Sequence, residues 1–139
     1  MPLRFLDTNI LLRYLTRDDE VRAQSAVALL TSIEQDEEKV VTSPMVIFET
    51  VFTMQTRYKA SRQQIKELVL PIVDMRSLQL PGKSVYRRAF DLYVGGRLSF
   101  ADAYNVAYME ADGLTEVYTW DRDFDRVPGI RRIEPPKPK

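Results

Sequence analysis

Short apolar segments with strand character alternate with longer segments of helical periodicity along this chain. The strand-like segments are 3–6, 39–42, 78–80, 116–119 and 131–133. Apolar residues recur at helical spacing over 9–15, 20–32, 43–58, 61–74, 84–94 and 99–111. Strands that alternate with helices favour a parallel sheet covered on both faces. We therefore predict an α/β fold: a three-layer α/β/α sandwich with a short-stranded, mainly parallel sheet.

Local start and stop signals support these helices. Ser43-Pro44 predicts a helix start, because serine is a good cap and proline suits the first helical position. Ser61 is expected to cap the next helix, with Pro71 acting as a breaker or kink near its end.

Length and composition predict one globular domain over 1–134, followed by a Pro/Lys-rich tail over 135–139. The chain has 139 residues, of which 45% are apolar and 29% charged. Its formal net charge is zero, so nucleic-acid binding would need a local basic patch. No signal peptide and no apolar run of about 20 residues is evident, so we expect a cytoplasmic location and no membrane partner.

The sequence contains no histidine and no cysteine. This composition excludes zinc sites built on histidine, Ser-His-Asp hydrolysis, paired-histidine ribonuclease chemistry and disulfides. Proton transfer is then left to carboxylates, lysine, tyrosine or water made acidic by a metal.

Several carboxylates lie within the apolar segments or directly after them. A carboxylate at the carboxyl end of a strand faces the crevice where open α/β sheets bind ligands. Several carboxylates crowded together repel one another unless protons or a cation intervene. A hard divalent cation held by oxygen ligands is the natural guest, so we predict a metal site. Its candidate ligands are Asp7, Glu49, Asp102 and Asp121.

Ordinary structural roles remain open for most of these acids. Asp7 or Asn9 could cap the helix that follows. Ser99 and Asp102 have the spacing of a capping box, and a first-turn acid also meets the positive end of the helix dipole. A structural role and a ligand role are compatible for Asp102, because each carboxylate offers two oxygens.

A purely structural role is harder to assign to Glu49 than to Asp121 and Asp123, the acids that follow the fourth strand. Glu49 sits among apolar neighbours in its helix, so it either emerges on a polar stripe or has a partner, which we favour. Asp121 and Asp123 suit a turn. In the functional interpretation, Thr119 and Asp121 lie on the same side of the chain at the strand end, and Asp123 could also reach the site.

The remaining acids are interpreted more simply. We expect them to lie on solvated faces or in loops: Asp18, Asp19, Asp36, Glu37, Glu38, Asp74 and Asp91.

Four motifs in order make the chain resemble the PIN-domain nucleases, and more closely the VapC-like toxins of type II toxin–antitoxin pairs. They are FLDTNIL at 5–11, SPMVIFE at 43–49, GRLSFADA at 96–103 and TWDRDF at 119–124. By this resemblance Asp7, Glu49, Asp102 and Asp121 correspond to the family's acidic quartet. The polar supports and the possible extra acid are Thr8, Asn9, Thr119 and Asp123. The resemblance implies a Mg²⁺- or Mn²⁺-dependent endoribonuclease, usually a homodimer, inhibited by an antitoxin partner.

The resulting hypothesis is metal-dependent hydrolysis of RNA phosphodiester bonds. Basic residues that could hold phosphates are Arg13, Arg17, Arg57, Lys59, Arg97 and Arg122. One alternative is a PIN-like module that binds RNA or protein without cleavage. Another is aspartyl-phosphate chemistry, which usually needs a second acid where this chain has Asn9.

Overall fold

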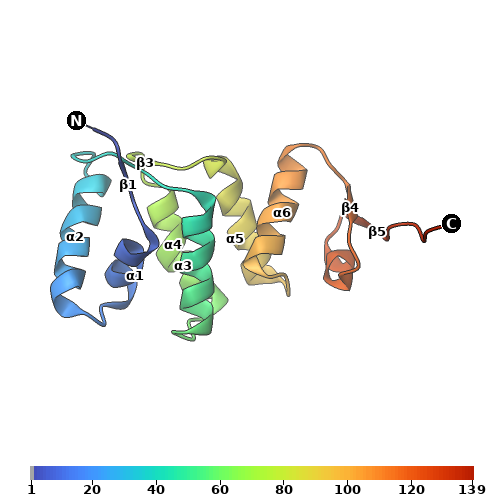
Figure 1. Cartoon of the computed structure of the whole chain (residues 1–139), viewed down its shortest axis with the longest axis horizontal. Coiled ribbons are helices and arrows are strands. Elements are labelled where there is room, and N and C mark those ends of the chain that lie inside the picture. The colour runs from blue at the N-terminus through green and yellow to red at the C-terminus, as the bar shows by residue number, and fades with distance from the viewer. Residues whose placement is uncertain (1) are drawn as a thin grey trace. The chain divides into compact units, whose positions relative to one another are not determined.

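The computed structural model describes residues 2–139, which form two compact units: a first that ends at Ser84 and a second, Val85–Lys139. The elements of the first unit, shown in Figure 1, are β1 (Arg4–Phe5), α1 (Thr8–Thr16), α2 (Glu20–Glu34), β2 (Val40–Val41), α3 (Pro44–Thr56), α4 (Arg62–Val73) and β3 (Leu78–Gln79). A 3₁₀ turn, η1 (Lys83–Val85), follows. The second unit contains α5 (Tyr86–Gly95), α6 (Phe100–Ala111), β4 (Glu116–Tyr118), the 3₁₀ helix η2 (Arg122–Arg126) and β5 (Arg131–Ile133).

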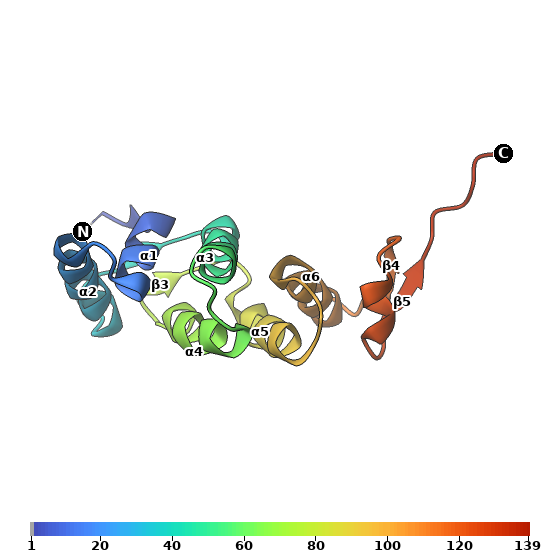
Figure 2. The same ribbon diagram turned by 90° about the horizontal axis from the view of Figure 1, so that it is seen from below.

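Three parallel strands in the order β1-β2-β3 organise the first unit. The pairing continues past the strands, since the Leu6 amide donates to the Val41 carbonyl at 2.8 Å and the Thr42 amide to the Gln79 carbonyl at 2.9 Å. Parallel neighbours need crossover connections, and Figure 2 shows α1 to α4 grouped around the strands. This pairing brings the carboxyl ends of the strands to one edge of the sheet.

Side-chain caps begin α3 and α4 where the sequence predicted them. The Ser43 hydroxyl accepts a hydrogen bond from the Val46 amide at 3.4 Å, and a proline occupies the first turn. Ser61 and Gln64 form a reciprocal capping box, with distances of 3.1 and 2.9 Å. Pro71 lies inside α4, which continues to Val73.

Helix packing buries the core of the first unit. Helix α1 packs against α2 and α3, and α3 packs against α4. Fully buried side chains from strand ends and helices meet there, including Leu6, Leu11, Leu30, Ile33, Ile47, Ile65, Ile72 and Leu78. Burial of each aliphatic side chain of this size contributes about 1.5–3 kcal/mol relative to leaving it exposed.

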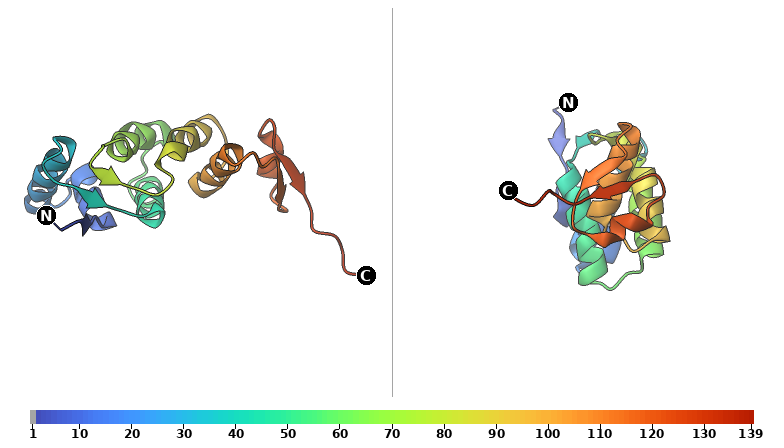
Figure 3. Two further views of the ribbon diagram at one scale, coloured as in Figure 1. Left: turned by 90° about the horizontal axis from the view of Figure 1, so that it is seen from above. Right: turned by 90° about the vertical axis from the view of Figure 1, so that its right-hand side faces the viewer.

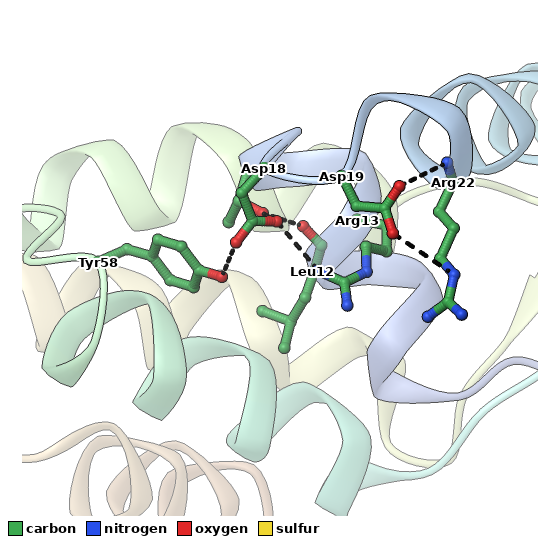
Figure 4. Close-up of polar contacts among 7 residues, drawn as sticks. Leu12, Arg13, Asp18, Asp19, Arg22 and Tyr58 are labelled. Carbon is green, nitrogen blue, oxygen red and sulfur yellow. Dashed lines mark hydrogen bonds and ion pairs between the residues drawn. The ribbon is translucent and has the colours of Figure 1, made fainter.

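A loop carboxylate fastens the end of α1 to the segment after α3 (Figure 4). Asp18 accepts hydrogen bonds from the Tyr58 hydroxyl at 2.7 Å, the Arg13 guanidinium at 3.0 Å and the Thr16 hydroxyl at 3.1 Å. The bond from Tyr58 is the main reason that the pKa of Asp18 lies below its ordinary value. Asp18 is therefore exposed in a loop, as predicted, but it also anchors its neighbours.

The second unit has an aromatic core and a parallel strand pair. Helix α5 packs on α6, and the Phe100 ring lies 4.7 Å from Phe90 and 5.5 Å from Tyr93, measured between ring centroids. Strands β4 and β5 are parallel, with Glu116 opposite Arg131, and Figure 3 shows them side by side.

The predicted α/β fold with short, mainly parallel strands is confirmed, with six helices in the expected order within residues 2–139. The 3₁₀ helix η2 was not predicted; a turn was expected there. No helix in the described part of the chain is both long and apolar enough to cross a membrane. The single domain over 1–134 stays a prediction.

Tyr86→Phe should stabilise the protein by about 1 kcal/mol, because it removes a buried polar group that has no partner. Among the buried side-chain polar atoms of residues 2–139, the Tyr86 hydroxyl alone lacks a hydrogen bond, and burial raises its pKa. Urea unfolding measures the change. Tyr93→Phe is the matched control, since this ring is equally buried but its hydroxyl is not orphaned. A loss of stability in Tyr86→Phe would contradict the prediction.

Candidate active site

Asp7 occupies the N-cap position of α1, directly after the first strand. Its backbone is extended, but its side chain makes no capping hydrogen bond, and the residue is exposed. The chain around it is held firmly, since Leu6 and Thr8 are buried and the Thr42 hydroxyl donates to the Leu6 carbonyl at 2.8 Å. The capping role is thus not realised by the side chain, and the carboxylate of Asp7 stays available to a ligand.

Glu49 lies in the second turn of α3, and the structure corrects how we interpreted it. Val46 and Thr50 are buried, but Glu49 is exposed, on the same side of the helix as Met45 and Phe52. Burial therefore gives no reason to require a partner for this carboxylate. The physical reason is that α3 is apolar around most of its circumference, so periodicity could not show which side the core covers.

Asp102 combines the two roles that the sequence left open. Its amide donates to the Ser99 hydroxyl at 3.1 Å, which caps the start of α6. Its carboxylate is partly buried. Burial is the largest cause that raises the pKa of Asp102, the charges of Asp121 and Asp123 raise it further, and a hydrogen bond with Ser99 opposes them. Asp102 thus holds a proton more readily than an ordinary aspartate.

Asp121 and its neighbours form a tight turn after β4. The Asp121 amide donates to the Thr119 hydroxyl at 3.0 Å. One carboxylate oxygen of Asp121, Oδ1, accepts from the Asp123 amide at 2.9 Å and starts η2. The turn interpretation is therefore realised, and Oδ2 of Asp121 is left for another partner. Thr119 thus contacts the backbone of Asp121, and its supporting role in a site stays a prediction.

The candidate acids are divided between the units. Asp7 and Glu49 belong to the first; Asp102, Asp121 and Asp123 belong to the second, where their charges interact. Neither unit, within residues 2–139, contains three carboxylates grouped closely enough to hold a metal ion by itself. The donor chemistry nonetheless fits a hard divalent cation, because partly buried carboxylates that repel one another gain from a positive charge.

The basic candidates differ in their availability. Arg13 is paired with Asp18 at 3.0 Å, so its charge is already balanced. Arg17 is exposed at the end of α1 with a positive φ of 56°, and Arg122 is exposed at the start of η2. Arg97 lines a cavity in the second unit together with Arg126. Arg126 was not predicted, because nothing in the local sequence distinguishes it from other surface arginines.

Comparisons with known proteins agree with this fold. The chain belongs to the PIN-domain family, whose pattern it matches over residues 4–130. It is also similar to a protein named VapC ribonuclease from Aquifex aeolicus (strain VF5), with 26% identity over 133 residues, which cover 96% of this chain and 97% of that relative.

Asp102→Asn should change the pH dependence of stability. With a folded pKa above the unfolded value of about 3.9, Asp102 binds more protons when folded, so its contribution to stability falls as the pH rises through this window. Asparagine removes that dependence. Relative to wild type, the variant should therefore gain stability as the pH rises through the ordinary aspartate value of about 3.9 and above it. Unfolding by urea at several pH values measures it, and a stability difference that stays constant with pH would contradict the assignment.

Proposed function

We propose that this protein is a metal-dependent endoribonuclease that hydrolyses phosphodiester bonds in RNA. Membership of the PIN-domain family supports the nuclease class, and the relative named a ribonuclease supports RNA as the substrate. The observation that carries the proposal is the half-buried Asp102, whose pKa is raised by burial and by Asp121 and Asp123, in a chain without histidine.

The proposed catalytic and metal-binding residues are Asp7, Glu49, Asp102 and Asp121, with Thr8, Asn9, Thr119 and Asp123 in supporting positions. Mg²⁺ or Mn²⁺, when bound, would supply water that loses a proton near neutral pH and positive charge against the phosphate. The Thr119 hydroxyl accepts a hydrogen bond from the Asp121 amide, and the Asp123 amide donates to Oδ1 of Asp121. The other carboxylate oxygen of Asp121, Oδ2, is left to serve as the proposed metal ligand. In the first unit, the absence of a capping bond to the carboxylate of Asp7 supports its proposed role as an oxygen ligand.

We further propose that the protein acts as the toxin of a toxin–antitoxin pair. The similarity to a VapC ribonuclease along almost the whole chain supports this role. It implies a cognate antitoxin as partner and a homodimer as the working form. Copurification with the product of a neighbouring small gene, followed by loss of RNA cleavage in the complex, would test the antitoxin.

Asp7→Asn should abolish metal-dependent cleavage and leave the fold intact, because it keeps the size of the side chain and removes ligand charge. Cleavage of a labelled RNA with Mg²⁺ or Mn²⁺ measures the effect, and sequencing the products gives the cut sites. Asp112→Asn is the control, since Asp112 is exposed at the end of α6. Wild-type cleavage by Asp7→Asn would refute the assignment. RNA that is bound but left uncut by the wild type would instead favour a binding module.

Divalent metal should stabilise the folded wild-type protein. A ligand at a hundredfold excess over its dissociation constant adds about 2.7 kcal/mol. The thermal midpoint should therefore rise with Mn²⁺ in the wild type and in Asp112→Asn, and rise less in Asp102→Asn, which lacks a proposed ligand. Equal shifts in all three proteins would remove Asp102 from the metal site.

A further inference from the structure

A cavity of about 660 Å³ lies within the second unit, between the end of α5 and the segment that follows η2. Small-molecule sites in proteins commonly have volumes of about 300–1,000 Å³, so this cavity is large enough for a single nucleotide. Side chains of two kinds line it, charged and apolar. The charged side chains include Arg88, Arg97, Arg126 and Asp123.

The three arginines differ in whether their charge is already balanced. Arg88 makes two hydrogen bonds to the Glu110 carboxylate, at 2.8 and 3.1 Å, and the charge of Asp91, which also lines the cavity, acts on it. Arg97 and Arg126 are exposed, and neither forms an ion pair with any of residues 2–139. The cavity therefore has two unbalanced guanidinium groups, which suit the planar, bidentate recognition of a phosphate.

One wall connects the cavity to the candidate acids. Asp123 lines it. The amide of the same residue donates to Oδ1 of Asp121 at 2.9 Å, and both charges act on Asp102. A phosphate held by the arginines would thus lie on the same side of this unit as its proposed catalytic carboxylates.

The rest of the lining is apolar. Leu98 and Val127 form its buried floor, at 4% and 6% exposure, and the more exposed Leu92 and Pro128 present the apolar surface. Such a surface offers contact area to a base or a ribose, whereas a site for a free inorganic anion would not need it. Phosphate contacts position a nucleic acid without reading its sequence.

We propose that this cavity holds one nucleotide of the RNA strand beside the bond that is cut, with Arg97 and Arg126 binding its phosphate. The choice of RNA as the ligand rests on the proposed function. The cavity itself and its two unbalanced arginines do not depend on that function.

Binding of a short fluorescent single-stranded RNA, measured at several salt concentrations, tests this site. The variants are Arg97→Gln, Arg126→Gln, the double variant and the two lysine substitutions, all in the full chain. Ca²⁺ replaces Mg²⁺, and product length is followed in the same samples. Arg131→Gln is the control, because it removes an exposed arginine of the same unit that lies on β5, does not line the cavity and is paired with Glu116 at 3.6 Å.

Each glutamine substitution should weaken binding about tenfold, as expected for a hydrogen bond to a charged group. It should also lower the slope of log affinity against log salt by about 0.7, and the double variant by about 1.4. The lysine variants should keep most of the slope, since they retain the charge. Arg131→Gln should bind like the wild type. If the double variant unfolds, the single glutamine variants and the lysine variants still show whether Arg97 and Arg126 bind the phosphate.

The outcomes separate this site from the proposed function. If the wild type cuts RNA and the glutamine variants bind with unchanged affinity and slope, the cavity is not the phosphate site and the nuclease proposal stands. If binding depends on Arg97 and Arg126 but Mg²⁺ produces no cleavage, the site stands and the nuclease proposal fails. A wild type that neither binds nor cuts RNA overturns both.

Discussion

Parallel pairing of two-residue strands determines where Asp7 lies, and most features of the first unit depend on it. So short a strand makes few hydrogen bonds of its own, and the register is supported by groups just beyond it. The Leu6 amide bonds to Val41, and the Thr42 hydroxyl bonds back to the Leu6 carbonyl in a buried position. Leu6 is thus held on both sides, and Asp7 follows it with its carbonyl bonded to the Ile10 amide at 3.2 Å and no capping bond from its side chain. A carboxylate placed this way is suited to a ligand.

The second unit achieves a related result through electrostatics. Asp102 occupies the first turn of α6, where the helix dipole favours a negative charge, yet burial and two neighbouring acids raise its pKa. Ser99 supplies the cap, so the carboxylate of Asp102 is not needed for it. Natural proteins tolerate such conflicts mainly where function requires them, because stability alone would select a neutral residue. The unfavourable electrostatic position of Asp102 is therefore stronger support for a functional role than its position in a sequence motif.

Features determined by neighbouring residues could be predicted from the sequence. Ser43-Pro44 and Ser61 mark helix starts because capping is a local interaction between residues three apart. Features determined by tertiary packing could not. The exposed side of α3, where Glu49 lies, depends on which helices cover it, and the sequence is apolar on several sides. The 3₁₀ helix η2 is held by local bonds, from the Asp123 amide to Oδ1 of Asp121 and from the Phe124 amide to the Asp121 carbonyl. It was still not predicted, because the same aspartates suit a simple turn.

Charge balance explains why the two arginines of the cavity, Arg97 and Arg126, could not be singled out from the sequence. The net charge is zero, and most candidate arginines have the same surroundings in the sequence. The structure distinguishes them by their partners. Asp18 pairs with Arg13, five residues away in the chain. Glu110 on α6 pairs with Arg88 on α5. Arg97 and Arg126 have no such partner within residues 2–139, although 29 positions separate them in the chain. Two arginines without an ion-pair partner therefore meet at one cavity, which favours an incoming phosphate, and Asp123 of the same lining connects this cavity to the acids.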